Sequence, residues 1–176
     1  MQFRRATGAD VLAIVALVES AYRGEASRAG WTTEADLLDG QRTDAAAVHQ
    51  LIDHPASQIL LAEDGEGGLI ASVAVTDEGE GTAAVHVGMF AVCPKKQGHG
   101  IGRALLAEAE ILGRRMGRDL ARMTVLAQRT ELIAWYERRG YRRTGSREPF
   151  PYGDPRVGLP RRNDLVFEVL QKPLTA

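Results

Sequence analysis

The chain has 176 residues, of which 44% are hydrophobic and 26% are charged, and its formal net charge is −1. This length and composition fit one globular domain over residues 1–176 and exclude a mainly disordered chain. The single cysteine excludes a disulfide framework and a cysteine-based zinc site, and no apolar run approaches the ~20 residues that span a bilayer. We therefore expect a cytoplasmic domain without a metal site or a membrane partner.

Charge is divided unevenly along the chain. Residues 1–92 carry 5 Lys/Arg against 14 Asp/Glu, whereas residues 93–176 carry 17 against 9. The basic half suits an anionic partner, which could be nucleic acid, a membrane surface or a phosphate-bearing small molecule, or it is a solvated surface. Its basic residues are scattered over predicted helices, strands and loops instead of forming a tail, which argues against nucleic acid.

The first half of the chain predicts a short strand, three helical segments and a meander. The first helix opens with the capping pair Thr7 and Asp10, and its apolar residues recur at helical spacing as far as Tyr22. Residues 24–33 are expected to form a loop. The remaining elements expected here are a strand at 2–5, short helices at 34–38 and 44–52, and strands at 58–63, 69–75 and 83–92. The turns between these last three strands are short, so we expect them to pair antiparallel.

The second half alternates helices and strands. Helices are expected at 101–116 and 130–139, and strands at 120–126, 141–144 and 165–170. Residues 146–163 hold four of the seven prolines and are expected to be irregular. The order β-α-α-β-β-β-α-β-α-β-β indicates an α/β (α+β) fold with a mixed, mostly antiparallel sheet and helices on both faces.

The segment VCPKKQGHGIGR, residues 92–103, is the most informative part of the sequence. It joins a strand to a helix, and glycines at 98, 100 and 102 leave main-chain N–H groups uncovered at the start of the helix, where an anion can bind. It matches neither a P-loop nor a G-x-G-x-x-G dinucleotide fingerprint, because Arg103 stands where the last glycine is required. What remains is Q-x-x-G-x-G, formed by Gln97, Gly100 and Gly102.

This pattern, preceded by V-x-P and followed by R-A-L-L, resembles motif A of the GNAT family of acyl-CoA N-acyltransferases. The stretch LIAWYERRGY, residues 132–141, is similar to a second family motif, and the order of elements agrees over nearly the whole chain. The resemblance implies a GNAT fold whose fourth and fifth strands splay apart. Acetyl-CoA (coenzyme A) is the implied cofactor, with its pantetheine arm bound along the fourth strand and its pyrophosphate on the glycine turn. The coenzyme-binding residues implied are Phe90, Ala91, Val92, Gln97, Gly98, His99, Gly100, Ile101, Gly102 and Arg103.

The resemblance also implies a chemistry in which a neutral amine attacks the thioester directly in a ternary complex, so Cys93 need not be a nucleophile. Tyr136 matches the family's general acid, and a main-chain N–H near Phe90 would stabilise the developing oxyanion. His86 is the candidate base, because an imidazole pKa near 6.5 suits that task, although a strand histidine can equally be structural and water could serve instead. Many relatives carry Asn where this chain has Arg129, so Arg129 could bond a coenzyme phosphate or the contact could be absent. Thr124 replaces a glutamate often found in relatives that modify protein N-termini, which argues against that activity.

The acceptor site is expected at the first helical pair and at the connection 146–163. Tyr22, Trp31 and Tyr152 are the substrate-binding candidates. Phe150 could share their apolar pocket, and Arg156, Arg161 or Arg162 could meet a carboxylate, although surface loops with anchoring aromatics are an equal alternative. We expect an acetyl-CoA-dependent N-acetyltransferase acting on the primary amine of a small molecule, as a monomer or homodimer. The alternatives are a non-catalytic acyl-CoA sensor, a protein or peptide N-acetyltransferase and, least favoured, a nucleic-acid-binding protein.

Overall fold

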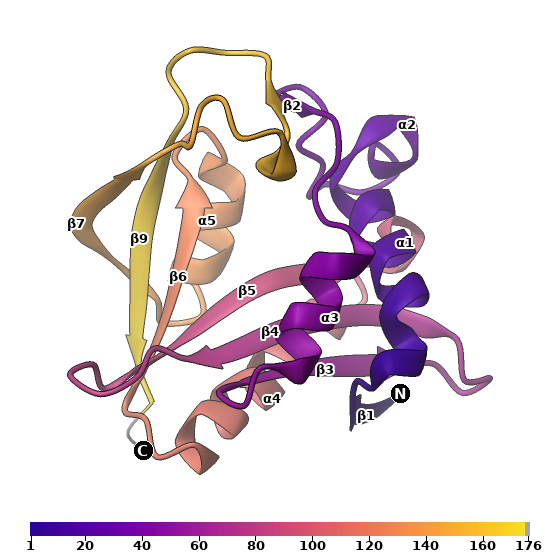
Figure 1. Cartoon of the computed structure of the whole chain (residues 1–176), viewed down its shortest axis with the longest axis vertical. Coiled ribbons are helices and arrows are strands. Elements are labelled where there is room, and N and C mark those ends of the chain that lie inside the picture. The colour runs from indigo at the N-terminus through magenta and orange to yellow at the C-terminus, as the bar shows by residue number, and fades with distance from the viewer. Residues whose placement is uncertain (175–176) are drawn as a thin grey trace.

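The computed structural model describes residues 1–174, which form a seven-stranded sheet covered by helices on both faces (Figure 1). The strand order is β1-β3-β4-β5-β6-β9-β7, and every neighbouring pair is antiparallel except β5 and β6. The strands of this sheet are β1 (Gln2–Arg5), β3 (Ser57–Glu63), β4 (Leu69–Asp77), β5 (Ala84–Val92), β6 (Leu120–Leu126), β7 (Arg142–Pro149) and β9 (Val166–Pro173). The expected mixed, mostly antiparallel sheet is confirmed.

The helices pack on both faces of the sheet. They are α1 (Val11–Tyr22), α2 (Gly24–Ser27), α3 (Ala45–Asp53), α4 (Ile101–Arg115) and α5 (Thr130–Glu137), with 3-10 turns at Gly8–Asp10, Pro94–Lys96 and Pro155–Val157. Thr7 and Asp10 form the expected pair before α1, since the Thr7 N–H donates to the Asp10 carboxylate over 2.8 Å. No helix among residues 1–174 is long and apolar enough to cross a membrane.

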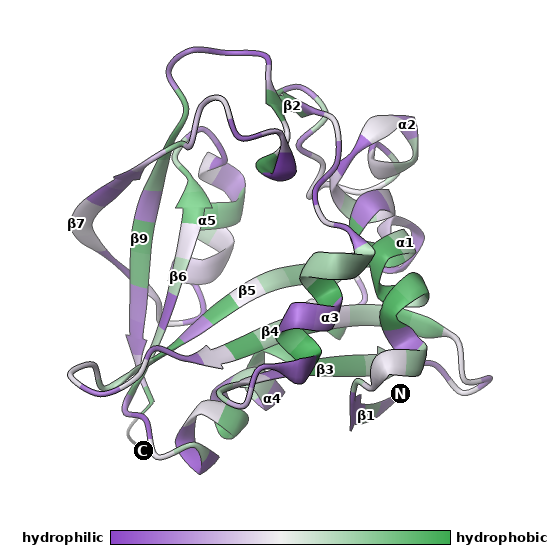
Figure 2. Ribbon diagram, in the orientation of Figure 1, coloured by the Kyte–Doolittle hydropathy of each residue, from purple (hydrophilic) through white to green (hydrophobic). Residues whose placement is uncertain are grey.

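Two apolar cores lie on opposite faces of the sheet (Figure 2). Successive side chains along a strand point to opposite faces, so a single strand contributes residues to both cores. On β4, Val73 and Val75 join the core under α4 and α5, whereas Ala74 between them joins the core under α1 and α3. The two-residue period of a strand therefore accounts for a central strand that is buried on both sides.

The connection between α1 and α3 differs from the sequence-based expectation. Residues 24–33 contain the short helix α2, and residues 34–38 form a single turn closed by the Leu38 N–H on the Glu34 carbonyl before a two-residue strand, β2 (Leu38–Asp39). The helix expected at 34–38 is therefore wrong. The physical reason is that the Glu34 side chain is buried in ion pairs and Leu38 is buried in a small core, and these two anchors hold the segment as one turn that does not continue into a helix.

The proline-rich connection is also more regular than expected. Strand β7 continues to Pro149, and β8 (Leu159–Pro160) pairs with β2. Because β7 is the edge of the sheet, a proline at its end removes no required ladder bond. Phe150 and Leu165 anchor the connection in the small core that also contains Leu38 and Leu126.

Candidate active site

The centre of the sheet opens into a wedge between β5 and β6. These strands pair only over Ala84–His86 and Leu120–Arg122, and beyond that point they diverge (Figure 1). The separation is accompanied by a bulge in β5, where the register against β4 shifts and Met89 adopts φ +46°. The expected splay of these two strands is confirmed, and it leaves the β6 side of the later β5 residues without a strand partner.

The glycine turn before α4 presents uncovered main-chain donors. Gly98 and Gly100 have φ of +83° and +80°, and a Cβ on either would point into open space. Within residues 1–174, no hydrogen bond uses the main-chain N–H groups from Gly98 to Arg103 as donors. Unpaired donors at a helix start fit a phosphate or pyrophosphate group. The turn therefore has the donor set that a coenzyme A pyrophosphate needs.

Gln97, expected at the coenzyme, is bound to a neighbouring loop. Its Oε1 accepts the Trp31 N–H over 2.9 Å, and its Nε2 donates to Thr32 Oγ1 over 2.8 Å and to the Val92 carbonyl over 3.1 Å. Gly30 allows this approach, because a Cβ there would lie 2.7 Å from Gln97 Oε1. The side chain of Gln97 thus fixes the loop 30–32 against the glycine turn.

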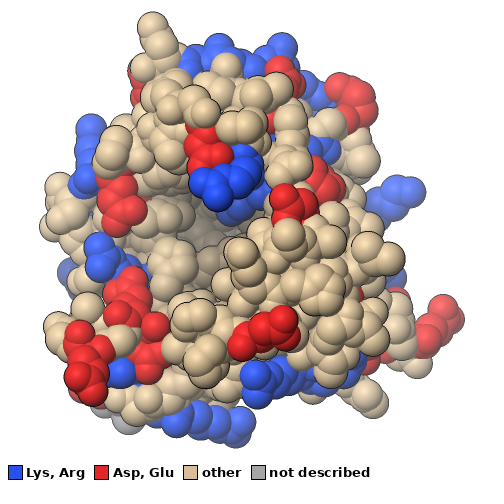
Figure 3. Space-filling model, viewed as in Figure 1, with Lys and Arg blue, Asp and Glu red and all other residues tan. Residues whose placement is uncertain are grey.

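Two cavities meet inside the wedge and share the side chains of Tyr22, Phe90, Leu132 and Tyr136. The smaller, of about 50 Å³, lies toward the glycine turn and is also lined by Trp31, Trp135 and Gly98. The larger, of about 130 Å³, lies between the strands; we call it the inner cavity. Figure 3 shows the face of the molecule hollowed at this place. Other residues lining the inner cavity are Glu34, Arg42, His86, Gly88, Thr124 and Arg129.

Tyr136 stands on α5 at the junction of the two cavities. Its ring packs against Trp135 and Phe90, with ring centroids 5.0 and 6.4 Å away, and the residue is 5% exposed. Burial raises the pKa of the phenol well above its usual value. The hydroxyl therefore keeps its proton at neutral pH and can donate it.

His86 lies on β5 at the last pair before the strands part, and its side chain lines the inner cavity. A Cβ at position 88 would lie 3.0 Å from His86 Nε2, so Gly88 makes room for the ring. Burial lowers the pKa of the imidazole, and this effect outweighs the opposing charges of Glu78 and Glu148. The ring is consequently neutral at pH 7, as a base must be.

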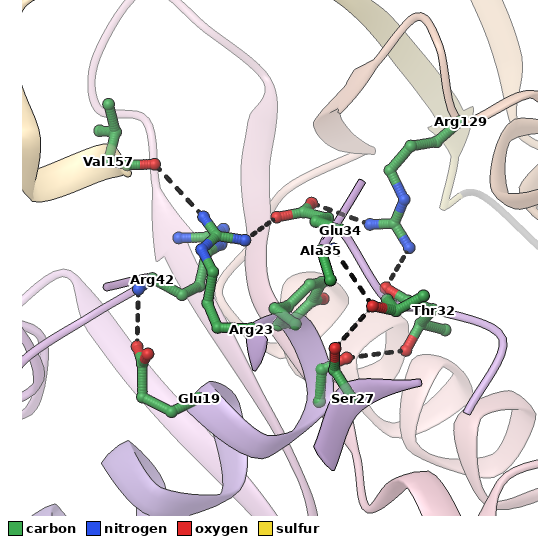
Figure 4. A network of polar contacts seen from close by, with 12 residues as sticks. Glu19, Arg23, Ser27, Thr32, Glu34, Ala35, Arg42, Arg129 and Val157 are labelled. Atoms are coloured by element: carbon green, nitrogen blue, oxygen red, sulfur yellow. Dashed lines mark hydrogen bonds and ion pairs between the residues drawn. The ribbon is translucent and has the colours of Figure 1, made fainter. Parts of the chain in front are cut away.

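A buried ion-pair network borders the inner cavity (Figure 4). Glu34 accepts from Arg129 over 2.9 Å and also binds Arg23, and Arg129 donates in addition to the Thr32 carbonyl. Burial alone would raise the pKa of the Glu34 carboxyl, but Arg129, Arg42 and Arg23 together lower it. Arg129, a candidate for a coenzyme phosphate, thus has its guanidinium bound to protein groups.

The aromatic residues of the connection 146–163 do not line the wedge cavities. Phe150 is buried beside Phe167, and the hydroxyl of Tyr152 bonds the Arg162 carbonyl and the Leu165 N–H. Neither residue lines either of the two wedge cavities, whereas Trp31 lines the smaller one. The three arginines each have a carboxylate neighbour, since Arg156 pairs with Asp154, Arg161 with Asp39 and Arg162 with Asp164. These pairs explain why the arginines are not turned toward the wedge cavities.

Other candidates lie where the sequence placed them. His99 is exposed, with Nδ1 2.9 Å from the Gln97 carbonyl, and Cys93 is half-buried against the core under α1. Sequence reasoning missed Glu34, Arg23 and Arg42, which come from loops and helix ends. They show no periodicity, and their partners are distant in the chain, so no local signal marks them.

The fold and this wedge agree with the comparisons to known proteins. The family model described as an acetyltransferase (GNAT) domain matches residues 55–143, and the chain belongs to the GNAT family of acyl-CoA N-acyltransferases. It is an acyltransferase enzyme of the general N-acetylating type. No curated protein matches the sequence.

Several solved structures share the fold over nearly the whole chain. A ribosomal-protein-alanine N-acetyltransferase from Brucella melitensis has a TM-score of 0.72 at 22% identity, with 98% of this chain and 99% of that chain covered. The ribosomal-protein-S18-alanine N-acetyltransferase from Escherichia coli has a TM-score of 0.72 at 14% identity, with 99% and 94% covered. A spermidine N-acetyltransferase SpeG chimera from Vibrio cholerae and hSSAT has a TM-score of 0.69 at 12% identity, with 99% and 96% covered. At these identities the likeness shows the fold alone.

Proposed function

We propose that the protein is an acetyl-CoA-dependent N-acetyltransferase that acts on the primary amine of a small molecule. The observation that carries this proposal is the position of Tyr136, a protonated phenol at the junction of two cavities inside a splayed pair of strands. One of these cavities adjoins the glycine turn, and the other is suited to the acceptor. Family membership supplies the general reaction, and this geometry supports its assignment to particular residues.

In this proposal, each group has one task. The N–H groups from Gly98 to Arg103 hold the coenzyme pyrophosphate, and the free β6 side of β5 near Phe90 to Val92 holds the pantetheine arm. Acetyl-CoA supplies a thioester whose acyl carbon accepts the amine. His86 takes a proton from the amine, directly or through water, and Tyr136 gives its proton to the leaving sulfur. No covalent bond to the protein is required, so Cys93 has no chemical role.

The acceptor amine could belong to a small molecule or to a protein N-terminus. The names of the solved relatives include both, with ribosomal-protein alanine on one side and spermidine on the other. An inner cavity of about 130 Å³ suits a small acceptor, in which the amine is attached to few heavy atoms. The loop 30–34 is tied to the glycine turn by Gln97 and to α5 by Arg129, which encloses the cavity and favours a small molecule.

Thiol release from acetyl-CoA in the presence of an amine panel tests the function. Tyr136→Phe should lower kcat by about 10²- to 10⁴-fold, the range of general acid catalysis, with the coenzyme Kd nearly unchanged. Tyr152→Phe is the matched control, because its hydroxyl bonds only loop groups, and its turnover should equal that of the wild type. Undiminished turnover in Tyr136→Phe would remove Tyr136 as the acid, whereas coenzyme binding without turnover for any amine or peptide would favour the sensor alternative.

A further inference from the structure

Arg42 lies where the inner cavity meets a second, outer space. The outer space, which we call the vestibule, has a volume of about 510 Å³ and lies between the start of α3 and the 3-10 turn Pro155–Val157. Arg42 and Met89 line both the vestibule and the inner cavity. The arginine is therefore placed along the route that joins them, and it is absent from the lining of the smaller cavity beside the glycine turn.

The main chain and the stem of Arg42 are held in place by neighbouring groups. Glu19 Oε1 accepts the N–H of Arg42 over 2.6 Å and that of Thr43 over 2.8 Å (Figure 4). The guanidinium carbon lies 5.4 Å from the centroid of the Tyr22 ring, a cation–π distance. The two main-chain bonds fix the point where the Arg42 side chain begins, and the Tyr22 ring gives its guanidinium a cation–π partner.

The guanidinium of Arg42 has no ion-pair partner within residues 1–174. The carboxylate of Glu34 is near enough for Arg42 to lower its pKa, but it is bound by Arg23 and Arg129. Three guanidinium groups therefore surround one carboxylate, which leaves this group of four residues with an excess of positive charge, and Arg42 is the one of the three arginines that forms no pair. A partly dehydrated cation of this kind is stabilised by a carboxylate or phosphate, which guanidinium groups bind through two parallel hydrogen bonds.

The carboxylates that line the vestibule bond to other groups and form no ion pair with Arg42. Asp44 caps α3 by accepting the Ala47 N–H over 2.8 Å and also binds Gln41. Asp154 is paired with Arg156 over 2.6 Å. His86, which also lines the inner cavity, is neutral at pH 7 because burial lowers its pKa. Among residues 1–174, Arg42 is thus the one charged residue that lines both the vestibule and the inner cavity.

From this arrangement we infer that the acceptor is an amine that also carries an anionic group, a carboxylate or a group of like chemistry. The anion binds Arg42 at the boundary between vestibule and inner cavity, and the amine extends into the inner cavity toward His86 and Tyr136. The guanidinium of Arg42 disfavours polyamines, since a second ammonium group at this boundary would meet a like charge. This inference rests on the proposed function and narrows its substrate class.

Matched acceptors test the assignment directly. The probes are ω-amino acids of increasing length and their primary amides, compared at equal concentrations of the neutral amine, because in the shorter pairs the far group changes the pKa of the amine as well as the charge. With the wild-type protein and acetyl-CoA, kcat/KM should be about 10- to 100-fold higher for the acid than for the amide at the best length, the ratio expected for one charge-assisted pair. Arg42→Gln should abolish this ratio by lowering kcat/KM for the acid alone, and Arg42→Lys should retain part of it.

Arg115→Gln is the control, because it removes one positive charge from the exposed end of α4. Arg115 lines neither the vestibule nor either of the wedge cavities. Its acid-to-amide ratio should equal that of the wild type. Calorimetry of the preferred amino acid against the protein with coenzyme A gives a readout besides turnover, and binding should weaken by the same factor in Arg42→Gln.

The outcomes separate the two proposals. If no amine of the panel stimulates thiol release, the proposed N-acetyltransferase function is overturned, and this inference with it. Turnover of amines with equal kcat/KM for acids and amides in the wild-type protein would overturn the role of Arg42 and leave the function standing. The wild-type ratio decides the matter even if the Arg42 variants fail to fold.

Discussion

The hydroxyl of Tyr22, at the end of α1, donates a hydrogen bond to the main-chain carbonyl of Phe90 in the bulge of β5. The bulge displaces this carbonyl from the regular ladder with β4. Burial raises the pKa of the Tyr22 phenol, so the donor proton is retained at neutral pH. This bond sets the orientation of the peptide group on which the proposed thioester site depends.

We therefore expect Tyr22→Phe to affect both stability and turnover. Loss of a buried hydrogen bond should lower the free energy of unfolding by about 1–3 kcal/mol. Displacement of the Phe90 peptide should lower kcat by about 10- to 100-fold, because small misplacements of reacting groups are costly. Urea unfolding and steady-state kinetics measure the two effects, and a variant with native stability and native kcat would show that the bulge needs no support from α1.

The glycine turn allows a prediction in which backbone strain is separated from ligand binding. Gly100 and Gly117 both have left-handed φ, +80° and +76°, and a Cβ on either meets open space. Alanine at either position should cost about 1–2 kcal/mol of strain. Only Gly100→Ala should also weaken coenzyme A binding in calorimetry, since Gly117 lies beyond the other end of α4. Equal coenzyme affinities in the two variants would contradict the assignment of the turn.

His86 predicts the acidic limb of the pH profile. Its pKa is lowered by burial, so kcat/KM for an acceptor should fall below pH 6.5 as the imidazole gains a proton. Glu78 opposes this shift by favouring the protonated ring, and its Oε1 lies 3.8 Å from Nδ1. Glu78→Gln should therefore move the limb to still lower pH, and His86→Gln should remove it. A limb that survives in His86→Gln would assign the base to another group or to water.

Local patterns carried most of the fold. The apolar stripe of α4 and the glycines before it concern contiguous residues, so local patterns located the helix and its start, whereas the wedge beside it was expected from the resemblance to the GNAT family. Proline content misled in the connection 146–163, because proline excludes a central strand but not the end of an edge strand. The structure shows that Pro149 stands at such an end.

The candidate site likewise contains residues that the sequence could indicate and residues that only the packed structure shows. Tyr136 was expected at the site from the family resemblance and His86 from its strand, and both side chains line the inner cavity, whereas their chemical roles stay predictions. The environment of Glu34 could not be anticipated, since its partners Arg23 and Arg129 come from the end of α1 and the start of α5. Acidic loop residues are usually solvated, and only the packed structure shows that this one is buried.

The buried carboxylate of Glu34 gives the last prediction, which concerns stability and its dependence on pH. Glu34→Gln leaves the buried guanidinium groups of Arg23 and Arg129 without their shared charge, and we expect a loss of about 3–5 kcal/mol in the free energy of unfolding at pH 7. The pKa of Glu34 is lower in the folded protein than its ordinary value of 4.5, so its stabilising charge is fully present above pH 4.5 and is lost as the pH falls through the folded pKa.

The stability difference between the wild type and Glu34→Gln should therefore be constant from pH 7 down to about pH 5 and shrink at lower pH, where the wild-type carboxyl is itself protonated. Asp36→Asn is the matched control, because its carboxyl pairs with Arg28 at the surface, where solvent screens the pair and its contribution to stability is small. Denaturant unfolding of both variants at a series of pH values measures the effect. A Glu34→Gln difference as small as that of Asp36→Asn would mean that the two arginines find other partners, and that the loop 30–34 is held to α5 by packing and by the bond from Arg129 to the Thr32 carbonyl instead.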